Sequence, residues 1–214
     1  MRSRYRRTAS TVKHEQDPAE AARAEAILGD LLDRAEAGLL DLVYLDECGF
    51  APSLPTGYSW SLPGQRKRVL YEYPQGRRVN VLATYRPHGD SPRLASAAFE
   101  RALTSDDLLE YLGGSPTASV PRVVVLDNAG LHVSKLVKAQ RKELTRRGIF
   151  LYFLPAYSPE LNRIEPVFKQ IKHHEIPRRS HKSKSELRAS VESGFESYGR
   201  KLDPKTVYEL RPAA

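Results

Sequence analysis

Apolar and polar residues alternate along the chain in blocks that predict helices and strands. The segment 17–38 is rich in helix formers, begins with Asp17 before Pro18 and ends at Gly38, which predicts a capped helix. Apolar runs predict strands at 77–86, 93–103, 122–127 and 149–154, and a short strand within 39–50 that ends at Asp46-Glu47. Further helices are expected at 104–112, at 133–147, from about 162, and at 183–200.

The order of these elements predicts an α/β fold. The early strands follow one another without helices, which favours antiparallel pairing, whereas the later strands alternate with helices, which favours parallel crossovers. We therefore expect a mixed sheet flanked by helices in a single domain. Residues 1–16 are expected to form a basic flexible arm, 17–180 the main domain including the leading helix 17–38, and 181–214 a C-terminal helix and tail.

The composition is that of an ordinary globular protein. Hydrophobic residues make up 40% of the 214 residues and charged residues 28%, a mixture that argues against disorder. The chain has no run of eighteen apolar residues, so we expect no membrane span, and its first residues lack the apolar core of a secretion signal. Cys48 is the single cysteine, which agrees with a reducing compartment. These features predict a cytoplasmic, nucleoid-associated protein.

The charge balance is basic and indicates a polyanionic partner. Lys and Arg number 34 against 26 Asp and Glu, giving a formal net charge of +8. The basic residues cluster in 1–13, 135–147 and 163–188. This clustering favours nucleic acid over a membrane surface or a merely solvated basic surface.

Two apolar strands end in carboxylates, at Asp46 and Asp127. Functional groups gather beyond the carboxyl ends of parallel strands, and neighbouring strands lie about 4.8 Å apart. Two such carboxylates would repel each other unless a cation lay between them. Oxygen ligands without a Cys or His cluster favour Mg²⁺ or Mn²⁺ over Zn²⁺. The alternative is that each residue merely starts a turn.

A third acidic residue, Glu165, follows the strand that ends at Leu154. It lies three residues after Asn162, which is the spacing of a helix capping box and favours a cap with no further role. A first-turn glutamate directed toward the strand ends is also well placed as a metal ligand. Asp107 has the same spacing from Thr104 and is expected to cap a helix rather than to bind metal.

Three ordered motifs resemble the DDE transposases of bacterial insertion sequences, in the branch allied to mariner elements. They are "YLDECGF" (44–50), "VVLDNAGLH" (124–132) and "FLPAYSPELNRIEPVFKQIK" (153–172), with "GYSWSLPGQ" (57–65) as a weaker fourth. The spacing between Asp127 and Glu165, 37 residues, is slightly wider than is usual in that branch. Arg163 stands where proline is common, and Phe168 where tryptophan is common.

The resemblance implies a ribonuclease-H-like fold, two Mg²⁺ (or Mn²⁺) ions, and double-stranded DNA from transposon ends and target as substrate. Carried over by motif, Asp46, Asp127 and Glu165 become the catalytic, metal-binding residues. Asn128, His132 and Asn162 become supporting residues, although His132 is equally suited to a polar role at a helix start. The predicted DNA contacts are Arg66, Lys67, Arg68, Lys135, Lys169 and Lys172.

The expected activity is metal-dependent DNA strand cleavage and strand transfer. Relatives generally begin with helix-turn-helix domains, and only about forty residues precede Asp46 here, so we expect a catalytic half with a separately encoded recognition half, dimeric on DNA. One alternative is a decayed or co-opted DNA-binding protein that keeps the fold but cuts nothing. Another ribonuclease-H-like nuclease, such as a resolvase or an RNA-hybrid nuclease, is disfavoured by the Tyr-Ser-Pro motif at 157–159.

Overall fold

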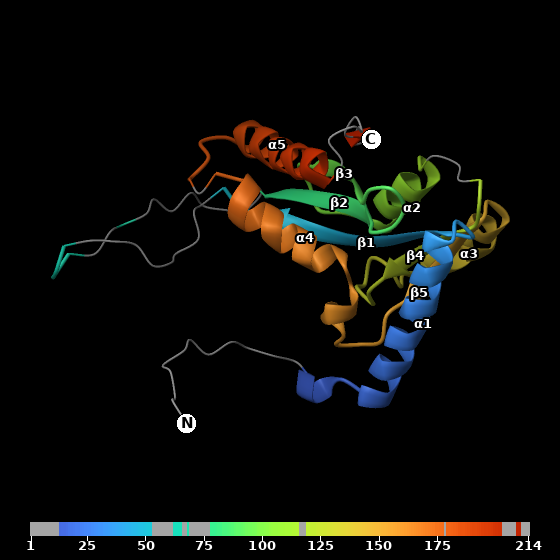
Figure 1. Cartoon of the computed structure of the whole chain (residues 1–214). Coiled ribbons are helices and arrows are strands. Elements are labelled where there is room, and N and C mark those ends of the chain that lie inside the picture. The colour runs from blue at the N-terminus through green and yellow to red at the C-terminus, as the bar shows by residue number, and fades with distance from the viewer. Residues whose placement is uncertain are drawn as a thin grey trace, which may run out of the picture.

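Figure 1 shows a twisted sheet with helices on both of its faces. The computed structural model describes residues 13–52, 62–65, 68, 78–115, 119–177, 179–202 and 209–210. The helices are α1 (Pro18–Glu36), α2 (Ser105–Gly113), α3 (Lys135–Arg146), α4 (Ile164–Gln170) and α5 (Lys184–Leu202). The strands are β1 (Asp41–Phe50), β2 (Val79–Arg86), β3 (Arg93–Phe99), β4 (Arg122–Leu126), β5 (Ile149–Phe153) and β6 (Glu209–Leu210). Short helical turns are η1 (Lys13–Glu15), η2 (Pro159–Leu161) and the π-helical η3 (Ile171–Glu175).

The sheet is mixed, as predicted, and its strands run in the order β5-β4-β1-β2-β3-β6. Strands β1, β2 and β3 form an antiparallel unit, whereas β4 and β5 add to β1 in parallel. The β1–β4 ladder ends at the pair Tyr44 and Val125, and beyond it β1 continues against β2, where Asp46 faces Ala83. Asp46 therefore lies just past the point where the parallel part of the sheet ends.

The pleat of β1 sends alternate side chains into two separate cores. Leu42 and Tyr44 pack on the face covered by α1, α4 and α5, whereas Val43 and Leu45 pack on the face covered by α2 and α3. The first core includes Phe195 of α5, whose ring makes edge-to-face contacts with Phe50 and Phe168 at centroid distances of 6.1 Å. Both faces of the central strand are thus buried.

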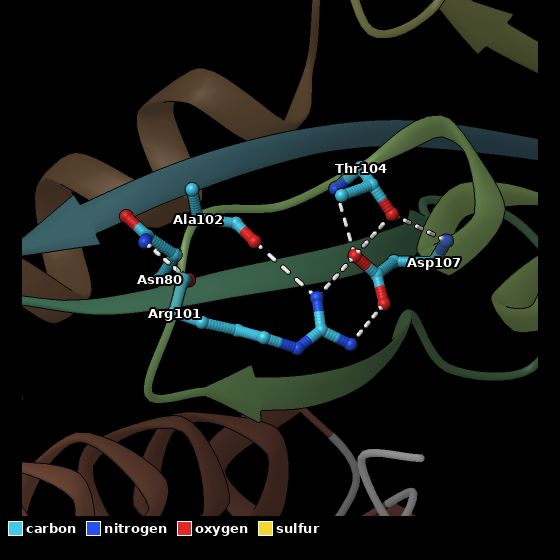
Figure 2. Close-up of polar contacts among 5 residues, drawn as sticks. All are labelled: Asn80, Arg101, Ala102, Thr104 and Asp107. Atoms are coloured by element: carbon cyan, nitrogen blue, oxygen red, sulfur yellow. Dashed lines mark hydrogen bonds and ion pairs between the residues drawn. The ribbon is translucent and has the colours of Figure 1, made fainter.

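The third predicted strand is shorter than expected, because the chain after Phe99 builds the start of α2. Arg101 donates to both carboxylate oxygens of Asp107 over 2.6 Å, and Asp107 also accepts from the backbone N–H of Thr104 over 2.7 Å (Figure 2). Thr104 in turn accepts from the backbone N–H of Asp107, so the predicted capping box is confirmed. The Arg101 guanidinium is the main cause that lowers the pKa of Asp107 to about 2.

A buried polar network closes the opposite end of β1. Asp41 accepts from Arg122 Nε over 2.6 Å, and the Arg86 guanidinium lies 3.3 Å from the same carboxylate. His88 Nε2 accepts from the backbone N–H of Leu42 over 2.9 Å, and burial lowers the pKa of this imidazole. Within the described part of the chain, no helix is long and apolar enough to cross a membrane.

Replacing Asp107 tests the capping network. We expect Asp107→Ala to lower the free energy of unfolding by about 2 kcal/mol, because it removes a cap and two charge-assisted hydrogen bonds. The folded pKa of about 2 lies below the ordinary value, so this contribution is present above about pH 4 and is lost as the pH falls through 2. Urea unfolding at pH 7 and pH 2 measures both effects.

The control for this change is Asp106→Ala, which removes the neighbouring acid. Asp106 is exposed, so its replacement should cost less than about 0.5 kcal/mol. Equal losses in the two variants would contradict the capping role of Asp107.

Candidate active site

Asp46 lies within β1 rather than at its end, which corrects the prediction that this strand stops at Asp46. The strand continues to Phe50 because β2 pairs with it beyond the end of β4. The Asp46 side chain is 6% exposed and accepts two hydrogen bonds. Its Oδ1 accepts from the backbone N–H of Glu47 over 2.8 Å, and its Oδ2 accepts from Asn162 Nδ2 over 3.1 Å.

Asp127 follows directly after the last residue of β4. Its Oδ1 accepts from the backbone N–H of Ala129 over 2.9 Å, which is the turn contact that a strand-ending aspartate commonly makes. The same oxygen lies 2.6 Å from His132 Nδ1. Burial on its own raises the pKa of Asp127, but the contacts with His132 and Ala129 outweigh it and lower the pKa. Asp127 therefore both stabilises the turn after β4 and contacts His132.

Glu165 lies in the first turn of α4, and its predicted capping box is wrong. The helix begins at Ile164 with Arg163 as the N-cap residue, and no side chain caps it. Asn162 is instead 1% exposed and donates its side-chain amide to Asp46. Because the Asn162 side chain donates to the buried Asp46 carboxylate, it does not cap α4. Glu165 is exposed at the start of that helix.

The electrostatics of Asp46 connect the three acids. Its pKa is raised to about 8, first by burial and then by the charge of Asp127, with smaller contributions from the charges of Glu47 and Glu165. The hydrogen bond from the Glu47 backbone opposes the rise. The site therefore carries more negative charge than its surroundings compensate.

The chemistry of these donors fits a hard divalent cation. All three are carboxylates, and a cation among them would relieve the repulsion that raises the pKa of Asp46. Among the described residues, however, no group of three or more His, Cys, Asp or Glu side chains is placed to hold a metal ion. Asp46, Asp127 and Glu165 stay the predicted ligands of such an ion.

His132 is completely buried between two carboxylates. Its Nδ1 lies 2.6 Å from Asp127, and its Nε2 lies 3.0 Å from Glu47 Oε2. Burial would lower the pKa of His132, but these two carboxylates raise it to about 9. The sequence interpretation missed Glu47 as a partner, although strand alternation places Glu47 on the sheet face opposite to Asp46.

The other predicted residues differ in how far the structure describes them. Asn128 donates to the carbonyl of Leu154 over 2.6 Å and so ties the end of β4 to the end of β5. Exposed basic side chains are present at Arg68, Lys135, Lys169 and Lys172. Arg66 and Lys67 lie outside the described residues.

The fold is shared with solved structures of the Mos1 transposase. The Mos1 strand transfer complex matches with a TM-score of 0.62 and 17% identity over 93% of this chain and 62% of that chain. The Mos1 paired-end complex with the left transposon end matches with a TM-score of 0.59 and 18% identity, over 93% of this chain and 62% of that chain. The Mos1 mariner paired end complex with Mn matches with a TM-score of 0.59 and 17% identity, over 94% of this chain and 63% of that chain. At this identity the likeness establishes the fold alone, which is the predicted ribonuclease-H-like sheet flanked by helices.

The sequence comparison identifies the family. Residues 41–188, more than half of the chain, match the family model described as DDE superfamily endonuclease. The chain belongs to this family, and the resemblance to DDE transposases is confirmed. This chain spans less than two thirds of the length of the chains in the first two Mos1 complexes. Comparison with curated proteins gives no match.

Removing the charge of Asp46 should stabilise the metal-free protein at high pH. The unfolded chain ionises this carboxyl from about pH 4, whereas the fold retains the proton until about pH 8, so the wild-type fold loses stability as the pH rises between these values. We expect Asp46→Asn to raise Tm more at pH 8 than at pH 4.5. The buried Oδ1 of Asn162, which has no hydrogen-bond partner, can accept from the new amide.

Thermal unfolding in excess chelator measures this effect. The control is Asp90→Asn, which removes the same charge from an exposed position. A Tm difference for Asp46→Asn that is the same at both pH values would contradict the raised pKa.

Proposed function

We propose that this protein is the catalytic domain of a transposase that cleaves and joins DNA strands with Mg²⁺ or Mn²⁺. The observations that carry the proposal are the match of residues 41–188 to the DDE superfamily endonuclease model and the hydrogen bond over 3.1 Å that Asn162, three residues before Glu165, donates to the buried Asp46. Burial first, and then charges that include those of Asp127 and Glu165, raise the pKa of Asp46. Three acids, separate in sequence and matching the family's motifs, thus act on one another electrostatically. The Mos1 relatives were solved in transposon-end and strand-transfer complexes, one of them with Mn, which supports DNA and a divalent metal as partners.

In this proposal each acid is held by its own neighbours. The Asn162 amide and the Glu47 backbone fix the Asp46 carboxylate, and the Ala129 backbone with His132 fixes Asp127. Glu165 is positioned by the first turn of α4. A pair of metal ions, when bound, supplies activation of the attacking hydroxyl and stabilisation of the leaving oxygen. The protein then needs no covalent intermediate with DNA.

Helix α3 presents the charge that we assign to the DNA backbone. Lys135, Lys138, Lys142 and Arg146 recur at helical spacing on one face, opposite to the buried Val137 and Leu144. This stripe runs for about 16 Å along the helix. Glu143, the acidic residue of α3, forms an ion pair with Arg146 over 2.8 Å. The stripe begins three residues after His132, so a duplex bound along it would lead to the carboxylates.

The central test is a nicking assay on duplex DNA with Mn²⁺. We expect Asp127→Asn to reduce the rate by about 10²-fold or more, because it removes a metal ligand worth several kcal/mol to the transition state. Asp90→Asn, which neutralises an exposed acid away from the site, should keep the wild-type rate. Equal activity of wild type and Asp127→Asn would end the metal-site assignment.

The same assay separates the remaining alternatives. A wild-type protein that binds DNA but cuts nothing with either metal would favour the decayed or co-opted DNA-binding protein. Faster cleavage of RNA–DNA hybrids than of duplex ends would favour the other class of nuclease. The dimeric state, the separate recognition half, the cellular location, the bacterial origin, the domain boundaries and the number of ions stay predictions.

Salt dependence tests the DNA-binding stripe. Each phosphate contact contributes about −0.9 to the slope of log K against log salt concentration, so Lys138→Ala with Lys142→Ala should make the slope less steep by about 2. The control pair is Arg34→Ala with Lys201→Ala, which removes two cations already engaged with Asp30 and Glu175. Fluorescence anisotropy of a labelled duplex measures both. An unchanged slope in the stripe variant would exclude this surface.

A further inference from the structure

Glu47 is an acid that the proposed metal site does not use. Glu47 directly follows Asp46 in β1, and the pleat turns its side chain to the opposite face of the sheet. There it meets the completely buried His132 at 3.0 Å, and His132 contacts Asp127 at 2.6 Å. We call these three residues the carboxylate bridge.

Glu47 is linked to both aspartates of the site, directly to one and indirectly to the other. Its backbone N–H donates to Asp46 Oδ1 over 2.8 Å, and its side chain is connected to Asp127 through His132. A single residue of β1 is thereby linked to a carboxylate within β1 and to one that directly follows β4. Any movement of Glu47 would alter the orientation of both.

The bridge also determines which oxygen of Asp127 is available. Oδ1 is occupied by the backbone N–H of Ala129 and by His132 Nδ1. These two contacts fix the rotation of the carboxylate and leave Oδ2 for a ligand. Side chains that hold metal-binding carboxylates in this way commonly contribute 10–100-fold to metal affinity.

The loop that carries His132 is held by a hydrogen bond from the start of α2. The carbonyl of Leu131 accepts from Ser105 Oγ over 3.0 Å, and Ser105 is the first residue of α2. That helix start is the one fixed by Thr104, Asp107 and Arg101 (Figure 2). The imidazole is thus held by packing and hydrogen bonds on the face of the sheet away from Asp46.

We propose that Glu47 and His132 are positioning residues, which orient Asp127 for the divalent metal from the opposite face of the sheet. Neither residue needs to touch metal or DNA. The inference rests on the proposed function, because it assumes that Asp127 binds the metal. It assigns a role to Glu47 and specifies the supporting role of the buried His132.

The test is titration of the full chain with Mn²⁺ alone, with bound ion followed by electron paramagnetic resonance. We expect His132→Ala to weaken Mn²⁺ affinity by about 10–100-fold and Glu47→Ala to weaken it less. The double variant should match His132→Ala, because the Glu47 side chain orients Asp127 only through the imidazole. His132→Asn should regain part of the affinity, since its amide can donate to Asp127 but cannot also reach Glu47.

Matched controls separate positioning from general loss of stability. His88→Ala removes another buried histidine, at the far end of β1, and Glu186→Ala removes another ion-paired glutamate with the same 31% side-chain exposure as Glu47. Both should keep the wild-type Mn²⁺ affinity. Thermal unfolding without metal checks that each variant is folded, and the partly exposed Glu47 keeps the test available if His132→Ala unfolds.

Two results would overturn the inference in distinguishable ways. If Asp127→Ala weakens Mn²⁺ binding while Glu47→Ala and His132→Ala do not, the bridge fails and the proposed function stands. If Asp127→Ala leaves Mn²⁺ binding unchanged, the metal site of the proposed function fails, and the bridge fails with it. Additive effects of Glu47→Ala and His132→Ala would also overturn the coupling.

Discussion

A buried carboxylate in the middle of a sheet is the constraint on which the rest of this structure depends. Asp46 is enclosed within β1, and its raised pKa records the free-energy cost of holding a charge there beside Asp127 and Glu165. Two neighbours reduce this cost, because Asn162 and the backbone N–H of Glu47 each donate a hydrogen bond to the Asp46 carboxylate. The divalent metal that we propose for this site would offset that cost, because a cation would replace the repulsion among the carboxylates with attraction.

The strand pleat distributes the site over both faces of the sheet. Asp46 faces α4, which brings Asn162 and Glu165, whereas Glu47 faces the layer of α2 and α3, which brings His132. The two layers are therefore coupled through a single dipeptide of β1. Packing far from the carboxylates, including the cap of α2, becomes part of what orients them.

Local signals predicted most of the elements, and they failed where tertiary contacts compete for a side chain. Asp107 caps α2 as its spacing predicts, because the cap uses only residues close in sequence. Asn162 has the same spacing to Glu165 but donates to Asp46, 116 residues away in sequence. Similarly, β1 continues past Asp46 because β2 supplies a partner there, in a register that the sequence did not specify.

The α/β fold class and the antiparallel and parallel halves of the sheet could be predicted from the amino-acid order, and its motifs indicated three acids as candidate ligands, because apolar periodicity and motifs involve consecutive residues. The burial of Asp46 within β1, its support by Asn162, and the link from Glu47 through His132 to Asp127 are visible only in the folded chain. These contacts join residues from different strands and loops, and their energies depend on burial and distance. Neither quantity exists until the chain has folded.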